Sequence, residues 1–280
     1  MVSQRTIPHG LHGDAGAVMA QAVAPPHNRR MAPNPAPWPY PRWIAHRGGG
    51  DQAPENTLAA FRTAAARGWQ MYECDAKLSA DGVVYLMHDD TLERTTSGQG
   101  PADALPWAAL SALDAGAWHS PAFTGEPPAP LAAVAAHCLA HGHALNIEIK
   151  PMPGQAAATG AAVARAAQAL WAPHADAAPP LLTSFQPDAL AAAQTAAPAL
   201  PRGLLLDTRW TGWEAAARSL GCMAIVAHHP LWDEALVKAT TGWRRLAYTV
   251  NDGAEAARLW ALGLDGLITD RIAQVRPDAA

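Results

Sequence analysis

Residues 71–90 read MYECDAKLSADGVVYLMHDD and hold the strongest structural signal in this 280-residue chain. Side chains of a strand alternate between its two faces, so Glu73, Asp75 and Lys77 share one face. Burying unpaired charge is expensive. Three ionisable groups on one strand face therefore indicate a functional site and not a structural core.

The same stretch predicts a hairpin. Asp81-Gly82 between two strand-like runs is a strong signal for a two-residue turn. With these two residues as the turn, Ala80 pairs with Val83, and counting back places His88 opposite Asp75. Directly paired residues share a face of the sheet. We therefore expect His88 to join the carboxylates of the first strand, although a longer turn would shift this pairing.

The same alternation recurs further along the chain in NIEIK, residues 146–150. Asn146, Glu148 and Lys150 share one face there, and the two isoleucines occupy the other. The two strands together offer three carboxylates, which suit a hard divalent cation such as Mg²⁺ or Ca²⁺. The candidate metal ligands are Glu73, Asp75 and Glu148. The alternative is a metal-free carboxylate set neutralised by Lys77, Lys150 and Arg47.

Short apolar runs alternate with alanine-rich helical runs on both sides of these strands. Principal strands are expected at 43–45, 71–77, 144–149, 180–184, 203–206, 223–227, 246–250 and 265–268, with a hairpin strand at 83–87. Helices are expected at 57–67, 154–170, 187–196, 211–220, 231–240 and 254–262, the first capped by Asn56 and ended by Gly68. This order predicts an α/β protein with a (β/α)8 TIM-type barrel, whose site lies at the carboxyl ends of the strands. A doubly wound open sheet is the alternative.

Two histidines at predicted strand ends complete the candidate site. The strand at 43–45 delivers His46 and Arg47, and the hairpin strand delivers His88. Imidazole titrates near working pH, so two such groups beside a metal indicate a general base and a general acid for phosphodiester cleavage. Arg47 and Lys150 are the expected cations for phosphate oxygens. The remaining histidines are interpreted as ordinary core or surface groups, except that one of His228-His229, at the end of the strand at 223–227, is a candidate for lining the substrate pocket.

Composition narrows the function classes. The net charge is −4 and no basic block is present, which argues against a nucleic-acid partner and against stable membrane association. Three widely spaced cysteines suggest neither a disulfide framework nor a zinc site, and favour a reducing compartment. Residues 1–30 lack the apolar run of a secretory signal, and no membrane span is evident. We expect a disordered tail over residues 1–36 and a barrel domain over 37–280, in the cytoplasm.

Eight short motifs, taken in order, resemble the glycerophosphodiester phosphodiesterase family. They are His46-Arg47-Gly48, Pro54-Glu55-Asn56-Thr57, Glu73-x-Asp75, Asp81-Gly82, His88-Asp89, Glu148-Ile149-Lys150, Tyr248-Thr249-Val250-Asn251 and Thr269-Asp270. Single motifs are weak signals, but the ordered set is highly specific. The resemblance runs from about residue 38 to the C-terminal end. Trp38-Pro39-Tyr40-Pro41 and Leu113-Asp114-Ala115-Gly116 further resemble the bacterial cytoplasmic branch, which accompanies glycerol 3-phosphate uptake.

The resemblance implies a TIM-type barrel with a small insertion within about residues 89–130. It implies metal-dependent hydrolysis of small glycerophosphodiesters to sn-glycerol 3-phosphate and an alcohol, hence a role in glycerol and lipid metabolism. One divalent metal would bind Glu73, Asp75 and Glu148, while Arg47 and Lys150 hold the phosphate. His46 and His88 would be the acid/base pair, with His46 as base and His88 as acid, although the reverse fits the sequence nearly as well.

The chain departs from many relatives at Tyr248, where they carry tryptophan, and Tyr248 is the expected substrate-binding residue, as an aromatic wall for the glycerol group. Glu55 is interpreted as ordering the loop after Gly50, with metal binding as the alternative. Two other activities remain open: a phospholipase-like enzyme that stops at a cyclic phosphate, and a non-catalytic phosphodiester-binding barrel. Headgroup preference, metal identity and oligomeric state are not determined by the sequence.

Overall fold

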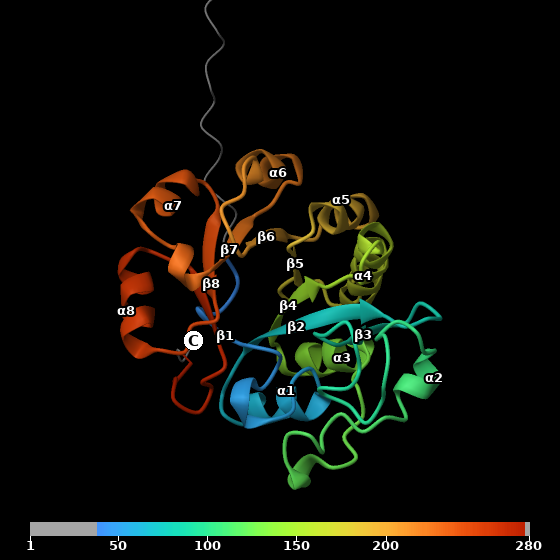
Figure 1. The fold of residues 1–280 in the computed structure, drawn as a ribbon. Helices are drawn as coiled ribbons and strands as arrows, with labels where there is room; N and C mark the ends of the chain where they lie inside the picture. The colour runs from blue at the N-terminus through green and yellow to red at the C-terminus, as the bar shows by residue number, and fades with distance from the viewer. Residues whose placement is uncertain (1–37, 278–280) are drawn as a thin grey trace, which may run out of the picture. The chain divides into compact units, whose positions relative to one another are not determined.

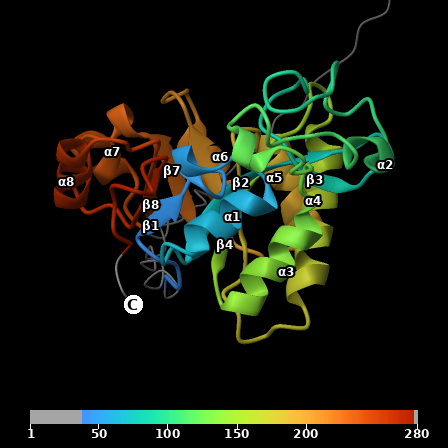
Figure 2. The same ribbon diagram turned by 90° about the horizontal axis from the view of Figure 1, so that it is seen from below.

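The computed structural model describes residues 38–277, in which nine strands and eight α-helices follow one another along the chain (Figures 1 and 2). The strands are β1 (Trp43–Ala45), β2 (Met71–Leu78), β3 (Val84–Leu86), β4 (Ala144–Ile149), β5 (Leu181–Ser184), β6 (Arg202–Leu206), β7 (Ala224–His228), β8 (Arg244–Tyr248) and β9 (Gly266–Thr269). The helices are α1 (Leu58–Ala65), α2 (Trp107–Leu110), α3 (Leu131–His141), α4 (Ala156–Trp171), α5 (Pro187–Ala196), α6 (Trp213–Ser219), α7 (Glu234–Ala239) and α8 (Gly253–Ala261). Short 3₁₀ turns occur at Gly50–Gln52, Pro121–Phe123 and His229–Leu231. The expected disordered tail lies outside the described residues.

Eight of these strands form a closed parallel barrel. Their order around the ring is β1-β9-β8-β7-β6-β5-β4-β2, and the pairing of Ala45 with Tyr72 closes β1 onto β2. The ninth strand, β3, pairs antiparallel with β2 outside the ring. Figure 1 shows helices placed around the outside of the strands. The predicted (β/α)8 barrel is confirmed, and the open-sheet alternative is wrong because the sheet returns to its first strand.

The β2–β3 hairpin forms, but its register differs from the predicted one. The amide of Met87 donates to the carbonyl of Asp75 at 2.9 Å, so Asp75 faces Met87 and not His88. A two-residue type I′ turn needs positive φ at both central residues, and in this turn only Gly82 has it, at +82°. The chain therefore turns over three residues, 80–82, which shifts the pairing by one position.

The loop before α1 also differs from the prediction. Thr57, and not Asn56, is the N-cap, and its side chain accepts a hydrogen bond from the amide of Ala60. Asn56 has a left-handed backbone with φ of +59°, and its amide group donates to Asp75 Oδ2 at 2.8 Å. The same side chain accepts from the backbone amide of Asp75 at 3.1 Å. Asn56 thus ties this loop to the middle of β2.

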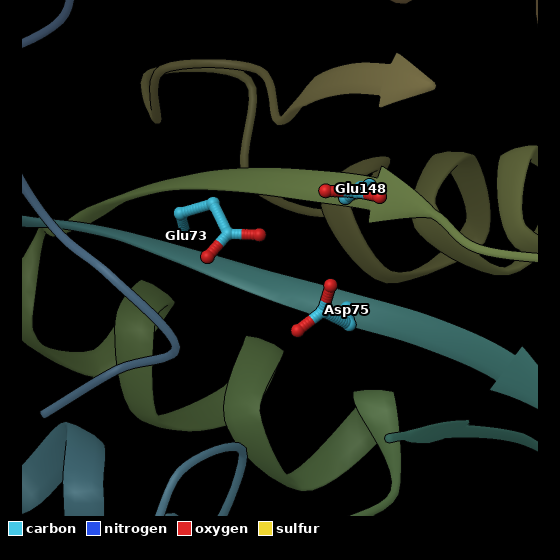
Figure 3. A group of neighbouring side chains, drawn as sticks. All are labelled: Glu73, Asp75 and Glu148. Carbon is cyan, nitrogen blue, oxygen red and sulfur yellow. The ribbon is translucent and has the colours of Figure 1, made fainter. Parts of the chain in front are cut away.

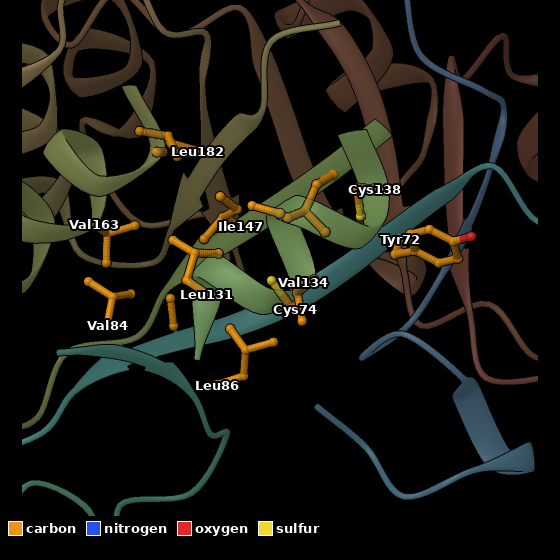
Figure 4. Packing of buried hydrophobic residues seen from close by; sticks show 14 of the residues in the cluster. Tyr72, Cys74, Val84, Leu86, Leu131, Val134, Cys138, Ile147, Val163 and Leu182 are labelled. Atoms are coloured by element: carbon orange, nitrogen blue, oxygen red, sulfur yellow. The ribbon is translucent and has the colours of Figure 1, made fainter. Parts of the chain in front are cut away.

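The outer faces of the barrel strands pack against the helices in an apolar core, and the polar faces of the strands point into the barrel. Cys74 and Ile147 point outward and pack with Leu131 and Val134 of α3 and with Val163 of α4 (Figure 4). The predicted helices do not include α3, although its buried residues recur at three- and four-residue spacing, the pattern of an amphipathic helix. Because the outer faces of β2 and β4 are apolar, their carboxylates are directed into the barrel.

Residues 87–130 run outside the ring, beside β3 and α3 (Figures 1 and 2). Met87, Leu92 and Leu110 of this segment form a small apolar core with Tyr85 of β3. Among residues 38–277, no helix has the length and apolar character needed to cross a membrane.

Candidate active site

The barrel places three carboxylates side by side. β2 and β4 are adjacent parallel strands, and their register sets Asp75 beside Glu148 and Glu73 beside Asn146. One oxygen from each of Glu73, Asp75 and Glu148 lies within 4.8 Å of the other two (Figure 3). The three predicted metal ligands are therefore neighbours on the inner wall.

Their electrostatics fit a bound cation. Burial, together with the neighbouring carboxylates, raises the pKa of Glu73 well above its usual value, and that of Glu148 to about 7. Burial raises the pKa of Asp75 too, but Lys150 and Arg47 outweigh burial and hold it well below its usual range. Three buried carboxylates that disfavour one another's charge are a donor set suited to Mg²⁺ or Ca²⁺.

Two cations border the carboxylates. Lys150 Nζ lies 3.0 Å from Glu148 Oε1 and 3.4 Å from Asp75 Oδ1. Arg47 Nε lies 3.5 Å from Asp75 Oδ2, and the Arg47 amide donates to Glu73 at 3.0 Å. Both side chains are close enough to the cluster for an anion held there to contact them.

Lys77 does not belong to this group. It is fully buried, and its ammonium donates to Asp90 Oδ1 at 2.8 Å and to the carbonyl of Lys150 at 3.3 Å. Of the three cations named in the metal-free alternative, Lys150 and Arg47 therefore contact the carboxylates and Lys77 does not.

Each of the two predicted histidines is held by a carboxylate. His46 Nδ1 lies 2.6 Å from Asp270 Oδ1, and its Nε2 lies 3.9 Å from Glu73. His88 Nδ1 lies 2.7 Å from Asp89 Oδ1. These bonds fix the orientation of both rings and assign the proton to Nδ1 in the neutral imidazoles.

A cavity of about 390 Å³ unites these groups at the carboxyl ends of the strands. Its lining consists of His46, Arg47, Asp75, His88, Glu148, Lys150, Phe185, Asp207, His228, Tyr248 and Thr249. The structure thus brings together the predicted histidines, cations and aromatic residue. Glu73 does not line the cavity, but one of its oxygens lies within 4.8 Å of the lining residues Asp75 and Glu148. His88 reaches the cavity despite the shifted hairpin register, because it lies just beyond the end of β3.

Comparison with known proteins identifies the family. Residues 46–274 match the model of the glycerophosphoryl diester phosphodiesterase family. The chain belongs to this family. YhdW of Bacillus subtilis is 31% identical over 236 residues, which cover 81% of this chain and 93% of that protein. A glycerophosphodiester phosphodiesterase of Caldanaerobacter subterraneus is 29% identical, again over 81% of this chain and 93% of that protein.

A solved structure is similar across the same region. The phosphodiesterase of Oleispira antarctica, solved in complex with the product sn-glycerol-3-phosphate, has a TM-score of 0.76 and 34% sequence identity. The match covers 82% of this chain and 93% of that chain. The family resemblance predicted from the ordered motifs is confirmed.

Two carboxylates of this family member have site contacts that the sequence motifs did not reveal. Asp89 and Asp270 belong to those motifs, yet the sequence assigned neither a role. Asp270 follows β9, and only closure of β9 onto β1 reveals that it lies beside His46. Asp89 directly follows His88, so its proximity was available from the sequence, but the direction of its side chain was not.

Glu55 lies in an ion-pair network and outside the carboxylate cluster. It accepts from Arg47 at 2.7 Å and from Arg94 at 2.8 Å, and Arg94 also binds Asp89. The network therefore connects the carboxylate behind His88 with the guanidinium that borders the carboxylate cluster. His228 lines the cavity, as the sequence indicated for one of two adjacent histidines, and Phe185 and Asp207 are further lining residues to which the sequence gave no role.

Tyr248 lines the cavity with its ring. Its hydroxyl donates to the carbonyl of Leu206 at 3.0 Å, so the hydroxyl is already engaged by the backbone. The ring lies edge-on to Phe185, with centroids 5.8 Å apart, and near His228 at the same distance. These three rings form an aromatic side of the cavity.

Proposed function

We propose that this protein hydrolyses sn-glycero-3-phosphodiesters to sn-glycerol 3-phosphate and an alcohol. The observation that carries the proposal is the convergence of three carboxylates, two cations and two carboxylate-held histidines on one cavity. The similar Oleispira protein, with sn-glycerol 3-phosphate as its product, supports the same reaction here. Family membership and site chemistry thus agree on phosphodiester hydrolysis.

Glu73, Asp75 and Glu148 would hold one Mg²⁺ or Ca²⁺ ion. When bound, such an ion supplies positive charge to polarise a phosphoryl oxygen and to stabilise developing negative charge. Arg47 and Lys150 contribute fixed positive charge beside the same position, and the guanidinium is suited to two phosphate oxygens at once. Glu55 holds Arg47 in place for this role.

The two histidines would transfer the protons of the reaction. His46 accepts the proton of the attacking water as that oxygen bonds to phosphorus, and His88 donates a proton to the alcohol oxygen as its bond to phosphorus breaks. Asp270 and Asp89 orient the two rings and stabilise their protonated forms. Burial lowers the pKa of His88, which favours its neutral form. The reverse assignment, with His88 as base and His46 as acid, is therefore the alternative that an experiment must distinguish.

The aromatic side of the cavity would face the glycerol group. If the site holds glycerol and phosphate, the alcohol lies towards solvent and its identity matters little, so we expect broad headgroup tolerance. Buried, unpaired thiols at Cys74, Cys138 and Cys222 and the net charge of −4 support action on small molecules in the cytoplasm, within glycerol and lipid metabolism.

The central test is release of glycerol 3-phosphate from glycerophosphocholine. We expect wild-type activity that a chelator abolishes and that Mg²⁺ or Ca²⁺ restores. His46→Ala, His88→Ala and Glu148→Ala should each lose at least about 100-fold in kcat, because each removes a proton carrier or a metal ligand. Unchanged activity in any variant would contradict the role of that residue, and an inactive wild type would contradict the proposed function.

A comparison of two substrates with different leaving groups shows which histidine is the general acid and which is the general base. A p-nitrophenyl ester leaves without protonation, so loss of the general acid should matter far less for it than for glycerophosphocholine. We expect p-nitrophenyl substrate to recover most activity in His88→Ala and little in His46→Ala. Recovery in His46→Ala instead would establish the reverse assignment. Phosphorus NMR of the products distinguishes direct hydrolysis from an enzyme that stops at a cyclic phosphate.

A further inference from the structure

Three histidines gather where α3 ends and β4 begins. His137 and His141 stand one helical turn apart, and His143 follows Gly142, which ends the helix with a left-handed backbone. The ring centroids lie 4.5 Å (137 to 141), 5.5 Å (141 to 143) and 6.2 Å (137 to 143) apart. A strand advances about 3.3 Å per residue, so His143 lies roughly 16 Å from Glu148 along β4. The group is therefore separate from the active site.

The hydrogen bonds of two rings determine which nitrogen carries the proton. His141 Nδ1 lies 2.8 Å from the carbonyl oxygen of His137, which can only accept, so this nitrogen is protonated. The Tyr72 hydroxyl gives its single proton to the carbonyl of Trp69 at 2.8 Å. It therefore accepts its second hydrogen bond, also 2.8 Å, from His143 Nδ1. In the neutral forms of both rings, Nε2 keeps a free lone pair.

The third ring supplies a nitrogen that lacks a partner. Nε2 of His137 is buried and has no hydrogen bond among the described residues. A buried polar atom without a partner has lost its hydration without a hydrogen bond to replace it, so such atoms call for an explanation. Burial lowers the pKa of His137 and of His143, and the neighbouring imidazoles act in the same direction. The neutral form, which can ligate a metal, is thereby favoured.

We propose that His137, His141 and His143 form a second metal site, which binds a divalent transition metal through three imidazoles. A metal-binding histidine commonly donates its other ring N–H to a carbonyl or similar acceptor, as His141 and His143 do here. Two histidines four residues apart on a helix are a recurrent zinc-binding pair. Three imidazoles and a water complete a frequent zinc geometry.

The two sites differ in their metal preference. Oxygen ligands suit Mg²⁺ and Ca²⁺, whereas imidazole suits Zn²⁺ and its neighbours among the transition metals. The ligand nitrogens of the three imidazoles do not all lie within 4.8 Å of one another, as the active-site carboxylate oxygens do. Metal binding therefore requires the exposed His141 to rotate from the position in which its Nδ1 donates to the His137 carbonyl, whereas His143 can keep its bond to Tyr72. An ion bound there would tie the end of α3 to the start of β4 and stabilise the folded state.

Calorimetric titration of the full chain with Zn²⁺, in excess Mg²⁺ to occupy the carboxylates, tests the proposal. His141→Ala removes one ligand from an exposed position and should raise the Kd of one Zn²⁺ ion by at least about 100-fold. His174→Ala, at an exposed histidine outside the group, should bind Zn²⁺ as the wild type does. Equal Zn²⁺ stoichiometry and affinity in wild type and His141→Ala would overturn the proposal.

Co²⁺ serves as a spectroscopic probe of the ligands. We expect Co²⁺ to give visible absorption bands of a nitrogen-ligated ion in the wild type and in His174→Ala, and to lose them in His143→Gln. Unfolding midpoints measured without metal show whether each variant is folded. A folded His143→Gln with unchanged Co²⁺ bands would exclude His143 as a ligand and contradict the three-imidazole site.

Discussion

At the scale of single residues, the two proposed catalytic histidines share one arrangement. His46 and His88 each have Nδ1 held by a carboxylate, at 2.6 Å from Asp270 and 2.7 Å from Asp89. This contact leaves Nε2 free to exchange a proton, and it would stabilise the imidazolium that the proposed reaction forms. Asp270 is itself held by Asn251 at 2.8 Å. We therefore infer that Asp270 and Asp89 are positioning residues.

Asp270→Asn tests this role directly. An amide can hold the ring but favours the wrong tautomer, and the analogous change in a serine protease lowers kcat about 10⁴-fold. We expect kcat for glycerophosphocholine to fall by about 10²–10⁴-fold while KM changes little. Asp176→Asn, at an exposed position away from the cavity, is the control and should retain wild-type kcat. A proportionate loss in both variants, or none in Asp270→Asn, would contradict the positioning role.

The sequence was sufficient to predict which residues face the site, but not which residues contact one another there. Alternation along a strand was sufficient to predict that Glu73, Asp75 and Glu148 face one side. Pairings across the closed ring, such as His46 with Asp270, depend on which strands become neighbours and cannot be counted along the chain. Asn56 was interpreted as a helix cap, whereas its side chain binds Asp75, since a short polar residue can serve either purpose.

At the scale of elements, the loop after β1 packs directly against the loop after β9. Gly50 has a φ of +53°, and a Cβ added to it would lie 2.1 Å from the carbonyl oxygen of Asp270. The amide of Asp51 donates to that same carbonyl at 2.9 Å. The two loops thus share a backbone contact that holds the main chain of Asp270 in position beside His46.

Gly50→Ala should damage activity through this contact. A side chain at Gly50 must displace the Asp270 backbone, and misplacement by about 1 Å can cost about 10²-fold in rate. Gly68→Ala is a matched control, because Gly68 also has positive φ, at +84°, but a Cβ added to it would have no atom within 4 Å. Both variants should lose roughly 1 kcal/mol or more in unfolding free energy. Only Gly50→Ala should lose kcat; equal kcat in both would contradict the coupling.

Element order was predictable, and element register was not. Period-two alternation and alanine-rich runs identified the eight barrel strands and most helices, because burial imposes those periods. The hairpin was displaced by one residue because only Gly82 adopts positive φ in its turn. Ser79 also accepts the Val83 amide at 2.9 Å and donates to Asp81 at 2.6 Å. These side-chain bonds support the longer turn, and propensity rules for Asp-Gly do not include them.

At the scale of the molecule, the barrel holds three buried carboxylates whose mutual repulsion is only partly offset by the cations beside them. Glu73, Asp75 and Glu148 are at most 9% exposed and belong to strands that also carry the surrounding core. Lys150 and Arg47 offset part of their repulsion, but the pKa of Glu148 is still raised to about 7, with burial as the main cause. A bound divalent cation should therefore stabilise the whole barrel as well as support the reaction.

Metal addition and one isosteric change test this link between site and stability. At 100 times its Kd, a ligand that binds only the folded state adds about 2.7 kcal/mol, which corresponds to roughly 5–10 °C in Tm for a chain of this size. We expect Mg²⁺ or Ca²⁺ to produce such a shift in the wild type and in Glu214→Gln, an exposed control. Glu148→Gln should show at most a small shift. Without metal at pH 8 it should be at least as stable as the wild type, because one buried negative charge is removed. A full Mg²⁺ shift in Glu148→Gln would exclude Glu148 as a ligand, and a shift that only Zn²⁺ produces would point to the histidine group instead.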